Sequence, residues 1–276
     1  MREVDVFHIG PQKAATTWIY RCFREHPAVA CPPTGAIHYY DIFYAKGEDW
    51  YARHFKAARS NQLTFDPTFT YIRSPWAPRR IAADNPDAKI ICFLRNPVDR
   101  AFSHYWHEKK KGKITFEFGE VLENYDLFSS WIEPGFYAEH LERYLKHFSR
   151  DQLLCLPFRL LKRDDEEFLR RILTFIDVDP SFQPSWLGEK ANEAGGRRTF
   201  TNAAWRRVRR RLERVGQGEL VESVENAPVV GRWVRDRDEY EEGMDEAVRR
   251  ELLEICEPEV RRIERLLSLN LEHWLQ

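Results

Sequence analysis

The chain has 276 residues, of which 43% are hydrophobic and 14% aromatic, so it can bury one substantial core. Its 43 Lys and Arg residues balance 44 Asp and Glu residues, for a formal net charge of -1. Binding to nucleic acid through bulk charge is therefore not implied, and a basic site must be a local patch. The five cysteines are widely spaced without a CxxC pair, which favours reduced thiols in a cytoplasmic protein over a disulfide framework.

The first residues show no signal-peptide pattern, because Met1, Arg2 and Glu3 lead directly into an apolar run. No uninterrupted apolar run approaches the ~20 residues that are needed to span a membrane. These two observations lead us to expect a cytoplasmic protein.

Short apolar runs along the chain predict strands. Because these runs are apolar throughout, they are typical of strands buried on both faces of a parallel sheet. Apolar residues at helical spacing lie between them and predict helices. The predicted strands are Val4–Ile9, Leu63–Phe65, Lys89–Leu94 and Gln152–Pro157, and the clearest helices are Thr16–Glu25 and Tyr137–Phe148. This alternation predicts an α/β fold, with a parallel sheet flanked by helices in a single domain, 1–276.

The composition changes after Pro184. Residues 188–243 are rich in glycine and arginine, and we expect loops and one helix there. From about Asp245 to Leu267 the apolar residues follow a strong helical pattern, in which Pro258 predicts a break or a kink.

The stretch "VFHIGPQKAATTWIY", residues 6–20, combines a strand, a turn with a lysine, and the start of a helix. If Thr16 and Thr17 open the helix, its free N–H groups and positive dipole end face the turn, and Lys13 projects over the same point. This pattern predicts a pocket for a terminal phosphate or sulfate group. It is not a Walker A loop, in which the lysine directly precedes Ser or Thr.

A second motif, "IICFLRNPVDRAFSHYWH", places Arg95 at the C-terminal end of a strand and Ser103 eight residues later, early in the next helix. Ligands of open parallel sheets bind beyond these strand ends. A planar guanidinium and a hydroxyl in this place are suited to a phosphate.

Together, the two motifs resemble those of sulfotransferases that use 3′-phosphoadenosine 5′-phosphosulfate (PAPS). The segment "IGPQKAATTWIY" is especially similar to the N-sulfotransferase domain of heparan sulfate enzymes, and "LTFDPTFTY" and "LLSLNLEHW" are further similar segments. The resemblance implies a P-loop-like parallel sheet and an in-line transfer of a sulfuryl group from PAPS, with 3′-phosphoadenosine 5′-phosphate (PAP) as product and no metal.

The resemblance also assigns roles in donor binding. Lys13 would stabilise the leaving phosphate, Arg95 and Ser103 would hold the 3′-phosphate, and a basic loop after two glycines would close over it. Trp18 is a candidate for contact with the adenine. The implied donor-binding residues are Lys13, Ala14, Ala15, Thr16, Thr17, Trp18, Arg95, Ser103, Gly196, Arg197 and Arg198.

An acceptor hydroxyl or amine also needs a general base. In the heparan-type relatives a glutamate directly precedes the segment that reads "IHYYD" here, and this chain has Ala36 in that position. Two residues are candidates to replace it: His38, because an imidazole titrates near neutral pH, and Asp66, because it matches an acidic residue of the same family region. Alternatively, His38 is a hydrogen-bonded loop residue, Asp66 is a turn residue, and the chain is a PAP-binding protein that lacks a base.

The expected acceptor is a saccharide, a glycan-like molecule or a small natural product, and we expect no nucleic-acid partner. Eight arginines between Arg197 and Arg214 could hold an anionic glycan, face an acidic membrane surface or form a solvated helix face; a membrane contact is not the expected role. A P-loop kinase is a further alternative, which the missing GK[ST] sequence and the pair of Arg95 and Ser103 disfavour.

Overall fold

The structure is a computed structural model that describes residues 4–185, 187 and 243–276. Residues up to 188 and from 244 onward belong to one compact unit. The Arg- and Gly-rich segment predicted to cover the cofactor site lies, apart from Gly243, outside the described residues.

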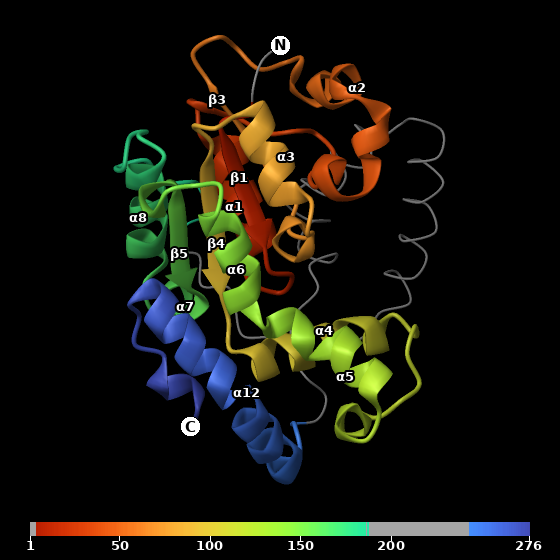
Figure 1. Ribbon diagram of the computed structural model, residues 1–276. Helices are drawn as coiled ribbons and strands as arrows, with labels where there is room; N and C mark the ends of the chain where they lie inside the picture. Colours follow the sequence, from red (N-terminus) through yellow and green to blue (C-terminus); the bar gives the residue numbers. More distant parts are fainter. Residues whose placement is uncertain (1–3, 186, 188–242) are drawn as a thin grey trace, which may run out of the picture. The chain divides into compact units, whose positions relative to one another are not determined.

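Five parallel strands form the centre of this unit, in the order β2-β3-β1-β4-β5 (Figure 1). The predicted parallel sheet flanked by helices is therefore confirmed. The strand that sequence did not predict, β2, has only two residues, too few to show a pattern. The strands are β1 (Val6–Gly10), β2 (Val29–Ala30), β3 (Leu63–Asp66), β4 (Lys89–Leu94) and β5 (Leu153–Pro157).

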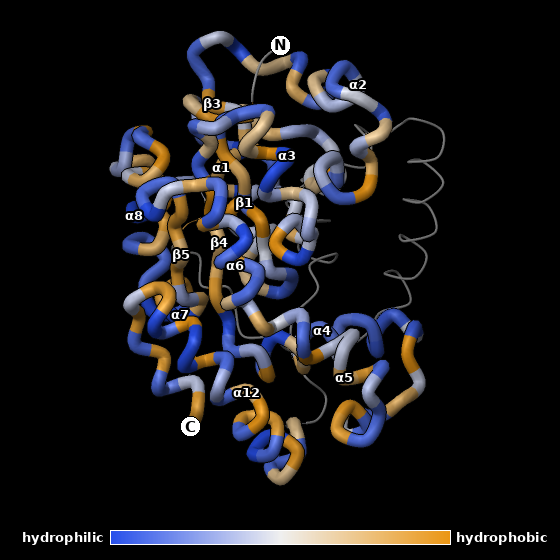
Figure 2. Tube along the Cα trace, in the orientation of Figure 1, coloured by the Kyte–Doolittle hydropathy of each residue, from blue (hydrophilic) through white to orange (hydrophobic). Residues whose placement is uncertain are grey.

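The helices cover both faces of this sheet. One face packs against α3, α6 and α12, of which α3 and α6 lie in front of the strands in Figure 1, and the other packs against α1 and α8. The strands between them are predominantly apolar (Figure 2). The helices are α1 (Thr16–Glu25), α2 (Glu48–Ala52), α3 (Ala77–Asp84), α4 (Pro97–Lys110), α5 (Tyr125–Trp131), α6 (Tyr137–Leu145), α7 (Phe158–Arg163), α8 (Asp165–Phe175) and α12 (Glu246–Leu267).

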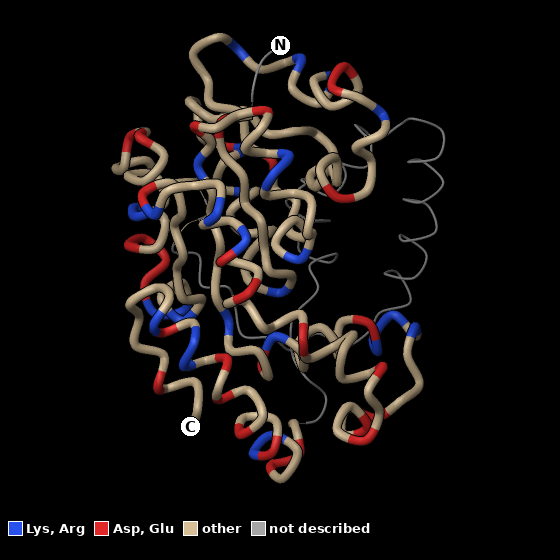
Figure 3. The backbone as a smooth tube through the Cα atoms, viewed as in Figure 1, with Lys and Arg blue, Asp and Glu red and all other residues tan. Residues whose placement is uncertain are grey.

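Helix α12 runs through Pro258 without the break that the proline predicted. The Pro258 ring is exposed, so water can satisfy the carbonyl group that loses its helical partner. The buried stripe continues on both sides of it through Leu252, Cys256, Val260 and Ile263. Charged residues of both signs cover the outer side of the helix (Figure 3). No helix in the described ranges has the length and apolar composition needed to cross a membrane.

The sheet order places the crevice for a ligand at the C-terminal end of β1. The strands β3 and β2 extend the sheet on one side of β1, and β4 and β5 extend it on the other. Open α/β sheets bind ligands where the direction of strand addition reverses, outside the carboxyl ends of the strands. The loops that follow β1 and β4 meet at this point.

His8, in the middle of β1, makes folding stability depend on pH. Its ring is fully buried against Phe93, with centroids 4.6 Å apart, and neither ring nitrogen has a hydrogen-bond partner within the described part of the chain. Burial lowers the pKa of His8 from 6.5 to about 3. The unfolded chain therefore binds a proton at His8 between these values while the folded chain does not, so stability is lost as the pH falls below 6.5.

For this reason we expect about 2 kcal/mol less stability at pH 5 than at pH 7 from His8 alone. Urea unfolding of the wild type and of His8→Leu at both pH values measures this contribution. The variant should show a pH-dependent loss smaller by about that amount. Equal losses in the two proteins would show that His8 is not the group responsible.

Candidate active site

The loop between β1 and α1 presents an uncapped helix end. Lys13 and Ala15 have left-handed backbone conformations, with φ of 70° and 61°, which turn the chain from the strand into the helix at Thr16. Helix α1 has no side-chain cap and no acidic residue in its first turn, so its N–H groups and positive dipole end are available to an anion. Thr16 Oγ1 is buried and finds no hydrogen-bond partner among the described residues, and it adds a further donor.

Gly10, the last residue of β1, allows the turn after β3 to approach this loop. Its φ is 123°, and a β-carbon on Gly10 would lie 2.1 Å from the carbonyl oxygen of Phe69. No residue other than glycine fits this approach. The segment that contains Phe69 and Thr70 therefore lies against the end of the strand from which the Lys13 loop starts.

Arg95 joins the two sequence motifs directly. It follows the last residue of β4, and its guanidinium donates to the carbonyl oxygen of Lys13 at 2.7 Å. The guanidinium also lies over the ring of Phe158, 5.2 Å from the centroid. Tyr137 donates its hydroxyl to the Arg95 carbonyl oxygen at 2.9 Å and thereby holds the backbone. The Arg95 guanidinium is thus fixed against the backbone of the first motif, at one edge of the sheet.

Helix α4 carries Ser103 into the same region. Asn96 caps the helix, since its Oδ1 accepts from the amides of Val98 and Asp99 at 2.9 and 3.3 Å, while its Nδ2 donates to the Trp274 carbonyl at 2.7 Å. Ser103 is 1% exposed, and its hydroxyl has no hydrogen-bond partner within the described ranges. A buried hydroxyl without a partner is unfavourable, and a ligand oxygen would satisfy it.

Arg100 is a charged residue of this region that the sequence motifs did not single out. Its side chain is buried and donates to the carbonyl oxygen of Trp131, at the C-terminal end of α5, while its Nε has no partner among the described residues. No ion pair joins it to a carboxylate in the described part of the chain. Burial lowers the pKa of Arg100 to about 10, and the positive charges of Arg73 and Arg95 act in the same direction. An excess of buried positive charge favours an anionic ligand nearby.

The candidate base His38 lies in a polar cluster with Thr70 and Asp41. His38 Nδ1 is 3.0 Å from Thr70 Oγ1, and Thr70 donates its hydroxyl to Asp41 Oδ2. Because that hydroxyl has one proton and gives it to Asp41, its oxygen must accept from His38 Nδ1. In the neutral imidazole the proton is therefore on Nδ1, and Nε2 is the basic nitrogen. Burial raises the pKa of Asp41, but hydrogen bonds from His38 and Thr70 outweigh this and lower it.

The candidate base Asp66 lies in the protein interior with its carboxyl group fully hydrogen-bonded, and this environment argues against a role as the base. It is fully buried, and its carboxyl accepts from the hydroxyls of Tyr51, Tyr71 and Thr68 at 2.8, 3.0 and 2.5 Å and from the Thr68 amide at 3.0 Å. Burial raises the pKa of Asp66, although these hydrogen bonds act in the opposite direction. Every lone-pair position of the carboxylate is in use, so it has no free position for an acceptor's proton.

Through two of these hydroxyls, Asp66 orients the segment that contains His38. Thr68 Oγ1 accepts from the amides of Ile37 and His38 at 2.9 and 3.2 Å. The Tyr71 hydroxyl accepts from the amides of the next two residues, 39 and 40, at 2.9 and 3.2 Å. Four consecutive backbone amides thus depend on one buried carboxylate. Asp66 therefore holds the backbone on which the candidate base His38 lies.

The remaining predicted residues are placed as follows. Ala14 is buried in the core beneath the loop and Thr17 is exposed. Trp18 packs edge-to-face on Phe168 of α8, with centroids 5.5 Å apart; its contact with adenine stays a prediction. Gly196, Arg197 and Arg198 lie outside the described residues. No group of three or more metal-ligating side chains occurs within the described ranges.

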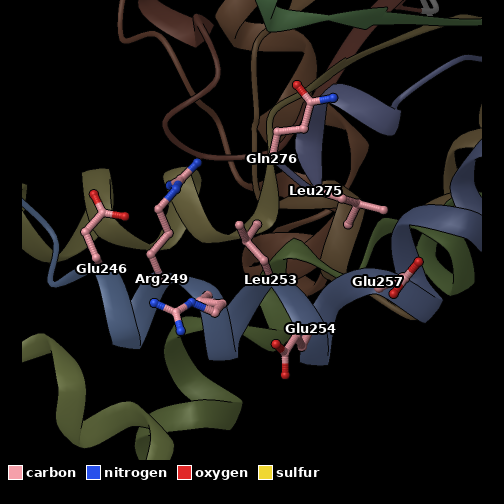
Figure 4. A pocket seen from close by; sticks show the side chains of 8 residues that line it. Glu246, Arg249, Leu253, Glu254, Glu257, Leu275 and Gln276 are labelled. Carbon is pink, nitrogen blue, oxygen red and sulfur yellow. The ribbon is translucent and has the colours of Figure 1, made fainter.

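A surface pocket of about 340 Å³ lies between α12 and the C-terminal residues (Figure 4), and its lining residue Arg249 pairs with Asp99 near the start of α4. Its lining combines acidic and basic side chains with two leucines. It includes no member of the two motifs or of the His38 cluster. The lining residues are Glu246, Arg249, Arg250, Leu253, Glu254, Glu257, Leu275 and Gln276.

Comparison with known families assigns the class of this fold and site. A family model described as a sulfotransferase domain matches residues 3–263, nearly the whole chain, so the chain belongs to the sulfotransferase family. The prediction of a sulfotransferase enzyme is thereby confirmed at the level of the family, and a P-loop kinase is not supported.

Relatives and solved structures agree with this class. The chain is 32% identical over 189 residues to the bifunctional heparan sulfate N-deacetylase/N-sulfotransferase 1 of Xenopus laevis and 32% identical over 191 residues to the human form 2. Each match covers 62% of this chain but 22% of the relative, so the chain spans about a fifth of their length. The crystal structure of a sulfotransferase from Alicyclobacillus acidocaldarius superposes with a TM-score of 0.73 at 23% identity, covering 100% of both chains, and shows the same fold.

Proposed function

We propose that this chain transfers the sulfuryl group of PAPS to the hydroxyl or amine of an acceptor. The observation that carries this proposal is the contact between Arg95 and the backbone of Lys13, because it joins two phosphate-binding motifs at the ligand edge of the sheet. Two anionic ends of one nucleotide explain why two separate basic motifs meet there.

The described residues fit such a donor. The uncapped N-terminus of α1, Lys13 and the Thr16 hydroxyl suit the 5′-phosphosulfate. The guanidinium of Arg95 and the unpartnered hydroxyl of Ser103 suit a 3′-phosphate. Both hydroxyls are buried and without partners among the described residues, so each would gain a hydrogen bond from a phosphate or sulfate oxygen.

In the proposed reaction the acceptor oxygen or nitrogen attacks the sulfur in line with the bridging oxygen. The new bond to sulfur forms as the bond from sulfur to the bridging oxygen breaks, and the electron pair stays on the phosphate of PAP. Lys13 stabilises that charge. His38 Nε2 takes the acceptor proton, since Thr70 and Asp41 hold the imidazole in the required tautomer.

The hydrogen-bonded cluster around His38 supports catalysis over the alternative of a PAP-binding protein without a base. A histidine oriented by a hydroxyl and a carboxylate has the arrangement of a positioned base. Ala36 lies two residues before it, so a lost glutamate does not leave the site without a proton acceptor. A saccharide is among the proposed acceptors because the relatives are heparan sulfate enzymes by name.

Calorimetric titration with PAP and with ATP tests the donor. Arg95→Ala should weaken PAP binding by about 10- to 100-fold, as expected for a lost charge-assisted phosphate contact. Arg262→Ala is a matched control, because this arginine pairs with Glu142 on the outer surface; its PAP affinity should equal the wild-type value. Tighter binding of ATP than of PAP would contradict the proposal.

A further inference from the structure

A link of two residues between β4 and α4 carries the arginine proposed to bind the 3′-phosphate. Strand β4 ends at Leu94, where its pairing with β5 also ends, and α4 begins at Pro97. Arg95 and Asn96 therefore form the whole link, and the Arg95 guanidinium reaches the Lys13 carbonyl oxygen at 2.7 Å. A functional side chain keeps one position only where surrounding contacts hold it. The contacts to this link thus decide where the guanidinium lies.

The first contact comes from the segment that follows α12. Asn96 Nδ2 donates to the Trp274 carbonyl oxygen at 2.7 Å, across 178 positions of the chain. Trp274 is buried, and its own amide donates to the Leu271 carbonyl oxygen at 2.7 Å. Leu271 is also buried, and its amide donates to the Glu264 carboxylate of α12 at 2.6 Å. The carbonyl group that accepts from Asn96 is therefore itself fixed in place.

The second contact reaches the link through α6. The hydroxyl of Tyr137, the first residue of α6, donates to the Arg95 carbonyl oxygen at 2.9 Å. The amide of the next residue, Ala138, donates to Glu259 Oε1 of α12 at 2.6 Å, across 121 positions. Amides in the first turn of a helix have no partner within the helix, so a carboxylate from outside caps this one. Glu259 thereby holds the start of α6, from which Tyr137 holds the Arg95 backbone.

The starts of α4 and α6 also pack directly against each other. Gly135 lies two residues before Tyr137, and a β-carbon on Gly135 would lie 2.7 Å from Cβ of Pro97, so a larger residue does not fit there. The cap of α4 needs only Asn96 Oδ1, which accepts from two amides of its first turn. The bond from Asn96 Nδ2 to Trp274 therefore adds a constraint that capping does not require.

We propose that Glu259 and Trp274, which we call the C-terminal anchor, position Arg95 for the 3′-phosphate of the donor. This inference rests on the proposed function and adds Asn96 and Tyr137 to its donor site as positioning residues. Because the anchor acts through Arg95, its loss should weaken the binding of PAP only where Arg95 is present. The two effects should therefore not add.

The test measures PAP affinity by calorimetric titration in variants that each remove one contact of the C-terminal anchor. Asn96→Ser keeps a side-chain oxygen that can cap α4 but lacks the donor to the Trp274 carbonyl group. Glu259→Ala removes the acceptor of the Ala138 amide, whereas Glu259→Gln keeps an acceptor oxygen. Asn96→Ser and Glu259→Ala are each also combined with Arg95→Ala. Urea unfolding shows whether every variant is folded under the conditions of the titration.

Two matched controls make the same changes away from the C-terminal anchor. Asn124 caps α5 through two backbone amides, as Asn96 caps α4. Glu257 is exposed on α12 and pairs with Arg261. Asn124→Ser and Glu257→Ala should therefore bind PAP with wild-type affinity.

We expect Asn96→Ser and Glu259→Ala each to weaken PAP binding by about fivefold or more, and Glu259→Gln to keep the wild-type affinity. Neither loss should appear in the presence of Arg95→Ala.

The inference alone is overturned if Asn96→Ser and Glu259→Ala both keep the wild-type affinity, or if their losses add to that of Arg95→Ala, because the contacts would then serve the stability of the fold. Absence of PAP binding in the wild type, or an undiminished affinity in Arg95→Ala, would instead overturn the proposed function, and the inference with it.

Discussion

Replacement of His38 by alanine is expected to lower kcat by about 10²- to 10⁴-fold, the range that loss of a positioned general base produces. His38 Nε2 is the basic nitrogen of a cluster in which Thr70 accepts from Nδ1 and donates to Asp41. Alanine removes this nitrogen, which is proposed to take the acceptor proton. Single-turnover rates with PAPS measure the chemical step directly.

A measurement of PAP affinity distinguishes a slower chemical step from impaired donor binding. The PAP affinity of His38→Ala should equal the wild-type value. Thr70→Val is the informative second variant, because it keeps the imidazole but removes the hydroxyl that fixes its tautomer. Its rate should fall by roughly tenfold, less than that of His38→Ala. If His38→Ala retains the wild-type rate and Ala36→Glu raises it strongly, the base had been lost at position 36 and His38 does not replace it.

Replacement of Asp66 by alanine is expected to lower the free energy of unfolding by about 3–5 kcal/mol. The change leaves three buried hydroxyls and the Thr68 amide without their acceptor, and it releases the hydroxyls that hold the amides of residues 37–40. Thermal unfolding should show a fall in Tm of about 10 °C for a chain of this size.

Asp66→Asn distinguishes the positioning role from a role in proton transfer. The asparagine amide keeps one acceptor oxygen but directs its NH₂ group at hydroxyl donors. We therefore expect Asp66→Asn to lower the free energy of unfolding by about half as much as Asp66→Ala. A fully stable Asp66→Asn protein whose transfer rate falls 10²-fold would instead make Asp66 the base.

Several parts of the site follow from local sequence rules. The apolar runs before Gly10 and Arg95 predicted strands with ligand-binding residues beyond their carboxyl ends. The structure pairs these two strands and brings Arg95 to the backbone of Lys13. The helix that begins at Thr16 and the strand Lys89–Leu94 have the predicted bounds. The local sequence determines these features, because an apolar run or a turn residue affects the backbone conformation of only a few neighbouring residues.

Other parts depend on contacts between residues that are far apart in the chain. Thr70 meets His38 across 32 positions, and Arg100 became a buried cation because α5 and α12 pack over α4. The break expected as one possibility at Pro258 is absent for the same kind of reason, since packing on both sides of an exposed proline keeps α12 continuous. No single-sequence pattern encodes which distant hydroxyl will face a carboxylate.

The amino-acid sequence thus determined the family, the parallel sheet and the positions of the two motifs proposed to bind the donor, because each is a local pattern with a fixed place in the fold. Only the tertiary structure shows the different surroundings of His38 and Asp66, on which their proposed roles rest. Both have titratable side chains near the same loops, but one keeps a free nitrogen at a half-buried position and the other is fully buried beneath four donors. That difference arises only when strands, turns and helices pack, since packing sets which polar atoms stay accessible to a substrate.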